Sequence, residues 1–125
     1  MLKVYLSGGM HGDWQEIVKV SCPDIHFINP KDHGLKDPKL YTIWDLTGVD
    51  ECDVILAYME KDNPGGQGLC YECGYGKGKG KLVIVVDEKM DRYMAILREH
   101  NLVLSTLTDA MLFLNALGKI WGKCG

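Results

Sequence analysis

Short apolar runs alternate along the chain with longer segments in which apolar residues recur every three or four positions. The first pattern is typical of β-strands and the second of amphipathic helices. The runs at 54–57 and 82–86 are apolar at every position, as expected of strands that are covered on both faces. The pattern predicts strands at about 2–7, 25–29, 53–59, 81–87 and 101–105, and helices at about 12–21, 39–51, 68–79, 89–99 and 107–118.

Five strand–helix repeats in succession predict an α/β fold. Because crossovers between parallel strands are right-handed, the expected architecture is a doubly wound, flavodoxin-like or Rossmann-like five-stranded parallel sheet with helices on both faces. The chain has 125 residues, of which 46% are hydrophobic and 25% are charged. These proportions suit one globular domain, and we expect residues 1–125 to form a single domain that carries the whole functional site.

The charge balance restricts the partners. A formal net charge of -3 leaves no basic surface for a nucleic acid polymer, whereas a small ligand, including an anionic one, is compatible with it. No apolar stretch approaches the roughly 18 residues that span a bilayer, and the chain opens into a predicted strand without the layout of a signal peptide. We therefore expect a cytoplasmic protein without a membrane partner.

The five cysteines, at positions 22, 52, 70, 73 and 124, are an odd number at low density. This composition predicts thiols rather than a disulfide framework. Cys70 and Cys73 form a C-x-x-C pair, for which zinc binding or redox chemistry is an alternative. A structural zinc site needs a second ligand pair, which the sequence lacks, so we expect neither a metal nor another cofactor.

Two glycine-rich turns each follow a predicted strand and precede a predicted helix. The first, at 8–12, has backbone N–H groups that can hold an anion, with His11 adding positive charge; the alternative is a tight turn with a solvated histidine. The second, at 65–68, lacks the lysine and hydroxyl residue of a nucleoside triphosphatase loop. The candidate substrate-binding residues are Gly8, Gly9, His11, Gly66, Gln67 and Gly68.

Two carboxylates are candidates for catalysis. Glu72 is expected in the first turn of the helix at 68–79, at the sheet edge where α/β proteins bind ligands. Asp45 lies near the middle of the helix at 39–51, either as a surface acid or facing the same crevice. Two carboxyl groups brought together acquire different pKa values, so that one donates a proton while the other stays ionised. The polar segment 29–39 is expected to be an ordered loop, either a plain connector or a cover for the ligand.

Three motifs resemble the nucleoside 2-deoxyribosyltransferases and the related deoxynucleoside 5'-monophosphate N-glycosidases. The resemblance spans about residues 2–87. Its motifs, in order, are Tyr5-Leu6-Ser7-Gly8, then Asp45-Leu46-x-Gly48-Val49-x-x-x-Asp53-Val54-Ile55, then Gly68-x-x-Tyr71-Glu72-x-Gly74-Tyr75-Gly76-x-Gly78-x-Gly80-Lys81.

The resemblance implies a role for each catalytic candidate. Glu72 matches the nucleophile that forms a covalent 2-deoxyribosyl ester, Asp45 the acid that protonates the departing base, and Tyr5 the residue that orients the nucleophile. The family needs no metal or cofactor. It completes its site with a residue from a neighbouring subunit, which implies a homodimer or larger homo-oligomer; the corresponding residue here is sought around 91–94.

The sequence also departs from the family pattern. Transferases that act on free nucleosides carry an acid six positions before the nucleophile, where this chain has Gly66, and nucleotide-hydrolysing relatives carry an arginine where this chain has His11. The expected activity is transfer of deoxyribose from a 2'-deoxynucleoside to another base. The alternatives are hydrolysis of a deoxynucleoside 5'-monophosphate and a non-catalytic nucleotide-binding module.

Overall fold

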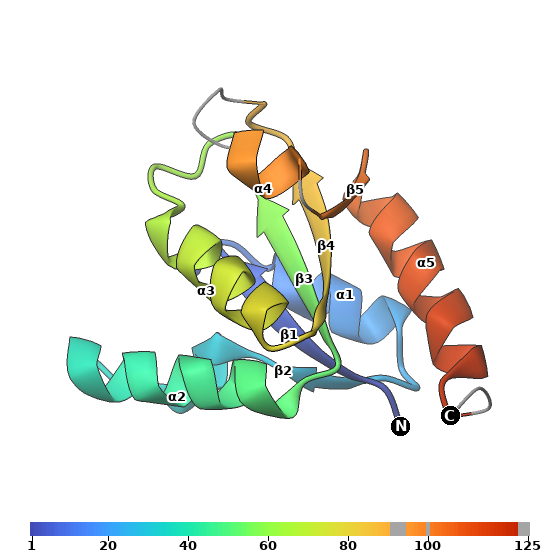
Figure 1. Cartoon of the computed structure of the whole chain (residues 1–125), viewed down its shortest axis with the longest axis horizontal. Helices are drawn as coiled ribbons and strands as arrows, with labels where there is room; N and C mark the ends of the chain where they lie inside the picture. Colours follow the sequence, from blue (N-terminus) through green and yellow to red (C-terminus); the bar gives the residue numbers. More distant parts are fainter. Residues whose placement is uncertain (91–94, 100, 123–125) are drawn as a thin grey trace.

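The computed structural model describes residues 1–90, 95–99 and 101–122. Within these residues one parallel sheet has the strand order β2-β1-β3-β4-β5 (Figure 1). Its strands are β1 (Lys3–Gly8), β2 (His26–Ile28), β3 (Val54–Met59), β4 (Leu82–Asp87) and β5 (Leu102–Leu104). The helices are α1 (Trp14–Ser21), η1 (Pro30–His33, a 3-10 turn), α2 (Pro38–Glu51), α3 (Gln67–Gly78), α4 (Ala95–Glu99) and α5 (Leu107–Ile120).

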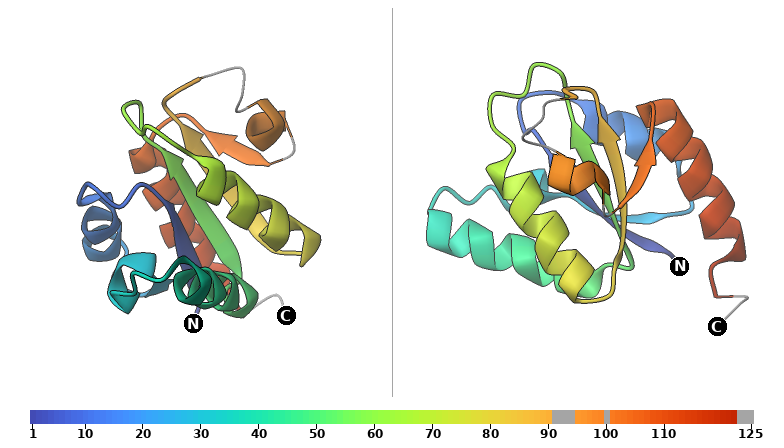
Figure 2. Two further views of the ribbon diagram at one scale, coloured as in Figure 1. Left: turned by 90° about the vertical axis from the view of Figure 1, so that its left-hand side faces the viewer. Right: turned by 45° about the horizontal axis from the view of Figure 1, so that its top comes forward.

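The helices cover the sheet on both faces (Figure 2). Side chains of α1 and α5 pack with one set of strand residues, and those of α2, α3 and α4 pack with the other set. In β3, Val54, Leu56 and Tyr58 face α1 and α5, while Ile55, Ala57 and Met59 face the opposite layer. This alternation across a two-sided sheet explains why β3 is apolar at every position.

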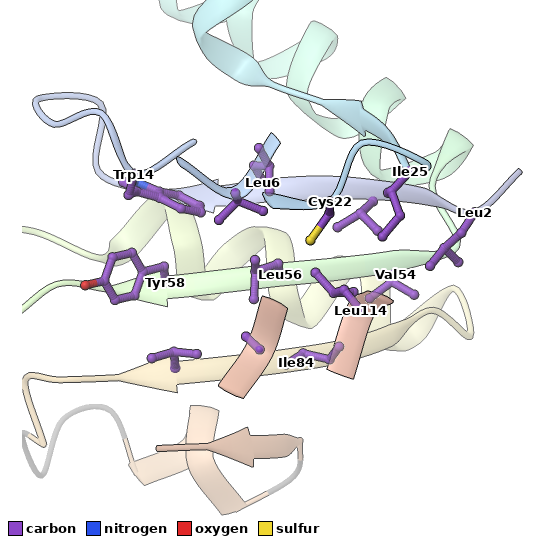
Figure 3. Close-up of a cluster of buried hydrophobic side chains, with 14 residues drawn as sticks. Leu2, Leu6, Trp14, Cys22, Ile25, Val54, Leu56, Tyr58, Ile84 and Leu114 are labelled. Carbon is purple, nitrogen blue, oxygen red and sulfur yellow. The ribbon is translucent and has the colours of Figure 1, made fainter. Parts of the chain in front are cut away.

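The core between the sheet, α1 and α5 is shown in Figure 3. Leu56 and Ile84 from the central strands lie at its centre, with Val18 from α1 and Leu114 from α5 packed over them, all fully buried. Near the carboxyl end of the sheet the ring of Trp14 meets Tyr58 edge to face, with 5.2 Å between ring centroids. Apolar side chains therefore fill the space between this face of the sheet and the helices α1 and α5.

The fold class predicted from the sequence is confirmed, and the element boundaries agree to within a few residues. The helix predicted at 89–99 is described only over α4, since 91–94 lie outside the described residues. The segment 29–39 was predicted to be an ordered loop without a helix or strand, and this was wrong for Pro30–His33, which form the turn η1 with Asn29 as its N-cap. The helix α2 begins at Pro38, with Asp37 as its N-cap, one residue before the predicted start. Proline suits the first helical position, where no backbone N–H is needed.

A second correction concerns α3. Its N-cap is Gly66, with φ of 128°, so the helix starts at Gln67 and Glu72 lies in the second turn instead of the first. Helical side chains lean towards the N-terminus, and Glu72 therefore still reaches the carboxyl end of the sheet. Further along, α3 approaches the sheet so closely that a Cβ on Gly76 would overlap Ile55.

The strand order creates a switch point at β1, which pairs with β2 on one side and with β3 on the other. The connections leave in opposite directions, because α1 packs on one face of the sheet and α2 on the other. In doubly wound sheets, ligands bind at such a point, beyond the carboxyl ends of the strands.

Among the described residues, no helix combines the length and the apolar character needed to cross a bilayer.

Candidate active site

Glu72 receives one hydrogen bond on each carboxylate oxygen. The Tyr5 hydroxyl donates to Oε2 and the Ser7 hydroxyl donates to Oε1, both at 2.6 Å. The two donors are alternate residues of β1 and point to the same face of the sheet, towards α3. Both are fully buried. The switch point thus holds a carboxylate between two rigidly placed hydroxyl groups.

Opposing effects act on the pKa of Glu72. Burial raises it most, the hydrogen bonds from Ser7 and Tyr5 lower it, and the neighbouring Asp45 raises it. The pKa of Tyr5 lies far above its ordinary range, because of burial and then because of the adjacent Glu72 charge. Tyr5 therefore remains a protonated donor at any working pH, and the two hydroxyls favour the ionised form of Glu72.

Asp45 presents a second carboxyl group to the same region. It projects from the middle of α2, its side chain is 18% exposed, and burial raises its pKa to about 6, with the Tyr5 hydroxyl acting in the opposite direction. Its Oδ1 is buried and has no hydrogen-bond partner among the described residues. Near neutral pH a substantial fraction of this side chain can therefore carry a proton.

The carboxyl pair lies in the walls of two cavities that share Tyr41, Asp45, Gly68 and Glu72. The first, of about 510 Å³, extends towards β1 and η1; the second, of about 370 Å³, extends between α2 and the start of α3. Both have the size of small-molecule sites. A further cavity of about 590 Å³ lies between α3 and α4, and the part of its lining that the structure describes contains no acid or histidine.

The predicted substrate-binding residues divide into two groups. Gly8 and Gly68 line the first cavity, and Gln67 and Gly68 line the second. Gly9, His11 and Gly66 line neither. The Gly9 carbonyl accepts hydrogen bonds from Trp14 and Gln15, and His11 turns towards Glu60, with Nε2 3.9 Å from Oε1.

The segment between β2 and α2 contributes cavity residues that the sequence did not single out. Lys31 and His33 of η1 line the first cavity, and the Lys31 ammonium donates to the Gly12 carbonyl. His33 is packed against the rings of Tyr41 and Trp44, at centroid distances of 6.0 and 5.2 Å. The sequence had indicated only that this segment is an ordered loop, either a plain connector or a cover for the ligand.

Ser7 was also missed as a partner of Glu72. The alternation of side chains along a strand offered a signal, because a residue two positions after Tyr5 faces the same side. The alternation predicts which face of the sheet Ser7 occupies, but it does not predict which residue of α3 lies opposite. The hydrogen bond between Ser7 and Glu72 therefore becomes evident only in the tertiary structure.

The C-x-x-C pair lies on α3, with Cys73 buried and Cys70 partly buried, and the two sulfurs are not joined in a disulfide. Burial raises the pKa of both thiols. Among the described residues, no group of three or more histidine, cysteine, aspartate and glutamate side chains is arranged to hold a metal ion.

Comparison with known proteins gives matches in structure. No protein-family model and no curated protein matches the sequence. A 2-desoxiribosyltransferase from Leishmania mexicana aligns over 93% of this chain and 98% of its own, with a TM-score of 0.72. A 2-deoxyribosyltransferase from Bacillus psychrosaccharolyticus aligns over 87% and 90%, with a TM-score of 0.73. A CMP N-glycosidase from Clostridium botulinum aligns over 91% and 98%, with a TM-score of 0.62.

Each of these three structures is 15% identical in sequence to this chain. The protein therefore has the fold found in 2-deoxyribosyltransferases and in an N-glycosidase, which confirms at the level of the fold the resemblance identified from the three motifs.

Proposed function

We propose that the protein, as a single domain over residues 1–125, cleaves the N-glycosidic bond of a 2'-deoxynucleoside and transfers the sugar to another base. The observation that carries this proposal is the arrangement of Glu72, held by two buried hydroxyls, in a cavity wall that also contains the protonatable Asp45. A nucleophile and a proton donor at one crevice are what glycosidic transfer requires. The fold shared with the three enzymes supports the same class of reaction.

In the first step a carboxylate oxygen of Glu72 attacks the anomeric carbon of the sugar. The bond from that carbon to the base nitrogen breaks, its electron pair stays with the base, and protonated Asp45 supplies the proton that the departing base needs. The products are a glycosyl ester on Glu72, a neutral base and an ionised Asp45. Burial helps this step, because the raised pKa of Asp45 lets it start protonated at a pH where an exposed aspartate has lost its proton.

In the second step a nitrogen of the incoming base attacks the same carbon, and the ester bond breaks to release the Glu72 carboxylate. Asp45 takes the proton from the incoming base and returns to its starting state. Each step inverts the anomeric centre, so the product retains the original configuration. Tyr5 remains a donor to Glu72 throughout and holds the carboxylate towards the cavity.

The proposal includes a homodimer or larger homo-oligomer in which a neighbouring subunit completes the site. The candidate contributing segment, 91–94, lies outside the described residues. Exposed apolar side chains on α2 and α3 support an association: Leu40 and Ile43 are 51% and 64% exposed, and Tyr71, which lines the second cavity, is 64% exposed. A cytoplasmic role in salvaging or removing bases fits this assignment.

A second candidate function is hydrolysis of a 2'-deoxynucleoside 5'-monophosphate, with water in place of the incoming base. The observation in its favour is Lys31, whose ammonium lies at the Gly12 carbonyl, beside the first glycine turn, and lines the cavity of Glu72. A cation there suits a phosphate, and position 66 has no carboxylate that would repel one. One of the three structural neighbours is a CMP N-glycosidase.

The deciding experiment is chromatographic. Wild type, Glu72→Ala and the exposed control Glu16→Gln are incubated with 2'-deoxynucleosides and their 5'-monophosphates, with and without a second free base. A new deoxynucleoside from wild type and the control, but not from Glu72→Ala, would support transfer. Free base together with deoxyribose 5-phosphate would move the protein to the hydrolases. No turnover of any substrate would favour a non-catalytic nucleotide-binding module and overturn the proposal.

A further inference from the structure

Ser7 is placed to control the orientation of Glu72 without touching the ligand. Its hydroxyl donates to Oε1 at 2.6 Å and its side chain is fully buried, whereas neither cavity that Glu72 lines includes Ser7 among its lining residues. The residue therefore contacts the carboxylate from the protein side, opposite the space where a substrate binds. An effect of Ser7 on a reaction must pass through Glu72.

One hydroxyl donor cannot fix a carboxylate. The last torsion of a glutamate side chain is broad, so a hydrogen bond to Oε2 alone leaves the carboxylate plane able to rotate about its axis. Tyr5 supplies that first bond, and Ser7 supplies a second bond to the other oxygen. Two donors on two oxygens define the plane, and with it the direction in which the remaining lone pairs point.

The donors are themselves fixed. Tyr5 and Ser7 lie within β1, where Tyr5 is paired with Ile55 and Ser7 with Ala57 of β3 in the centre of the sheet. The adjoining Gly8 approaches β3 so closely that a Cβ would lie 2.6 Å from the Tyr58 carbonyl oxygen. The hydroxyls of β1 therefore have little freedom to follow a displaced carboxylate, and they impose their geometry on Glu72.

We propose that Ser7 is a positioning residue for the nucleophile, and that its hydroxyl sets the orientation of the Glu72 carboxylate and favours its ionised form. This inference rests on the proposed function of Glu72. Ser7 is neither a nucleophile nor a proton donor to the substrate. Its single hydroxyl proton is directed at Glu72, which as a carboxylate can only accept.

The test compares Ser7→Ala, Ser7→Cys and Ser21→Ala, the last being an exposed serine at the far end of α1. Protein labelled with ¹³C at the glutamate side-chain carboxyl is titrated by NMR, with Glu72→Gln identifying the Glu72 signal. The pKa of Glu72 is expected to rise from wild type to Ser7→Cys to Ser7→Ala, since a thiol is a weaker donor, and to stay unchanged in Ser21→Ala. This NMR titration does not depend on catalytic turnover.

The second readout is kinetic. In Ser7→Ala we expect kcat to fall about ten- to a hundredfold, the loss typical of a hydrogen bond to a charged group, with KM within about threefold and the acidic limb of the pH profile moved to higher pH. An unshifted Glu72 titration in Ser7→Ala, or a kcat within about twofold of wild type at every pH, would overturn the role of Ser7 while leaving the proposed function intact. Retained activity in Glu72→Gln would instead overturn the proposed function, and the role of Ser7 with it.

Discussion

Nε2 of His33 lies 3.6 Å from Oδ1 of Asp45, across the gap between η1 and α2. The distance is too long for a direct hydrogen bond, and the buried Oδ1 has no hydrogen-bond partner among the described residues. The histidine ring is held nearly parallel to Tyr41, with an interplanar angle of 8°, and meets Trp44 at 67°. The aromatic packing of His33 therefore fixes where its nitrogen faces the candidate acid.

Replacing His33 with phenylalanine should separate its two functions. His33→Phe keeps an aromatic ring between Tyr41 and Trp44 but removes both nitrogens, Nε2 that faces Asp45 and Nδ1 that accepts a hydrogen bond from the Leu35 backbone N–H. We therefore expect a stability loss of about 1 kcal/mol, the usual contribution of one hydrogen bond, and a fall in kcat of about three- to tenfold. Thermal unfolding and steady-state kinetics measure the two effects. An equal loss in His33→Phe and His33→Ala would confirm the role of the nitrogen, whereas full activity in His33→Phe would assign the residue to packing alone.

The raised pKa of Asp45 predicts how stability depends on pH. The unfolded chain loses this proton near pH 4 and the folded protein near pH 6, so the contribution of the protonated side chain is fully present below about pH 4 and is lost as pH rises through about 6. Asp45→Asn cannot ionise. It should match wild type at pH 4 and be more stable by about 1–2 kcal/mol at pH 8, as measured by urea unfolding. An equal difference at both pH values would contradict this account.

The raised pKa of Asp45 also predicts the alkaline side of the pH–rate profile. The first step needs Asp45 protonated, so release of the first base should slow as pH rises above about 6. Rapid-quench measurement of the base released in a single turnover isolates this step. Because Asp45 and Glu72 influence each other, the profile reports apparent pKa values of the pair. Asp45→Asn should lose this limb together with most of the activity.

Gly48 is predicted to control activity through Tyr5. A Cβ at position 48 would lie 3.0 Å from Cε2 of Tyr5 and 3.0 Å from Cγ2 of Ile28, tighter than ordinary packing. Gly48→Ala should therefore move the tyrosine ring and its hydroxyl away from Glu72, lowering kcat by about tenfold or more and stability by about 1–3 kcal/mol.

The matched control is Gly74→Ala in α3, where a Cβ meets no atom of the described residues within 4 Å apart from its own helix. This change should leave kcat unaltered and raise stability by up to about 1 kcal/mol, since alanine favours a helix over glycine. Kinetics and urea unfolding of the two variants side by side test whether the close approach at Gly48 is responsible. Similar changes of kcat and stability in the two variants would argue against a role for the close approach at Gly48.

Lys31 is predicted to distinguish nucleotide from nucleoside. Lys31→Met keeps the aliphatic stem but removes the charge beside the first glycine turn, so kcat/KM for a 5'-monophosphate should fall about ten- to a hundredfold, while the value for the nucleoside stays within about twofold. Lys36→Met, an exposed lysine of the same segment that does not line the cavity, is the control. Equal losses on both substrates would remove Lys31 from phosphate recognition.

The local pattern of the sequence determined most of the architecture. Apolar runs and helical periodicity depend on neighbouring residues, so the five strands and the helices could be located to within a few residues. The continuous apolarity of β3 indicated a sheet that is covered on both faces. Glu72 and Asp45 became candidates through their positions in the predicted fold, and the resemblance to a known family added Tyr5 and suggested a role for each of the three.

The tertiary structure decided which side chains meet. The bond from Ser7 to Glu72 joins residues 65 positions apart and depends on how α3 lies against β1, which no local pattern records. Proline and polar residues in 29–39 were read as a loop, yet tertiary contacts place His33 at Asp45 and Lys31 at Gly12. Conversely His11, adjacent to the switch point in sequence, turns towards Glu60. Periodicity fixes the elements, but helix approach and strand order fix the distances between side chains, and the chemistry depends on those distances.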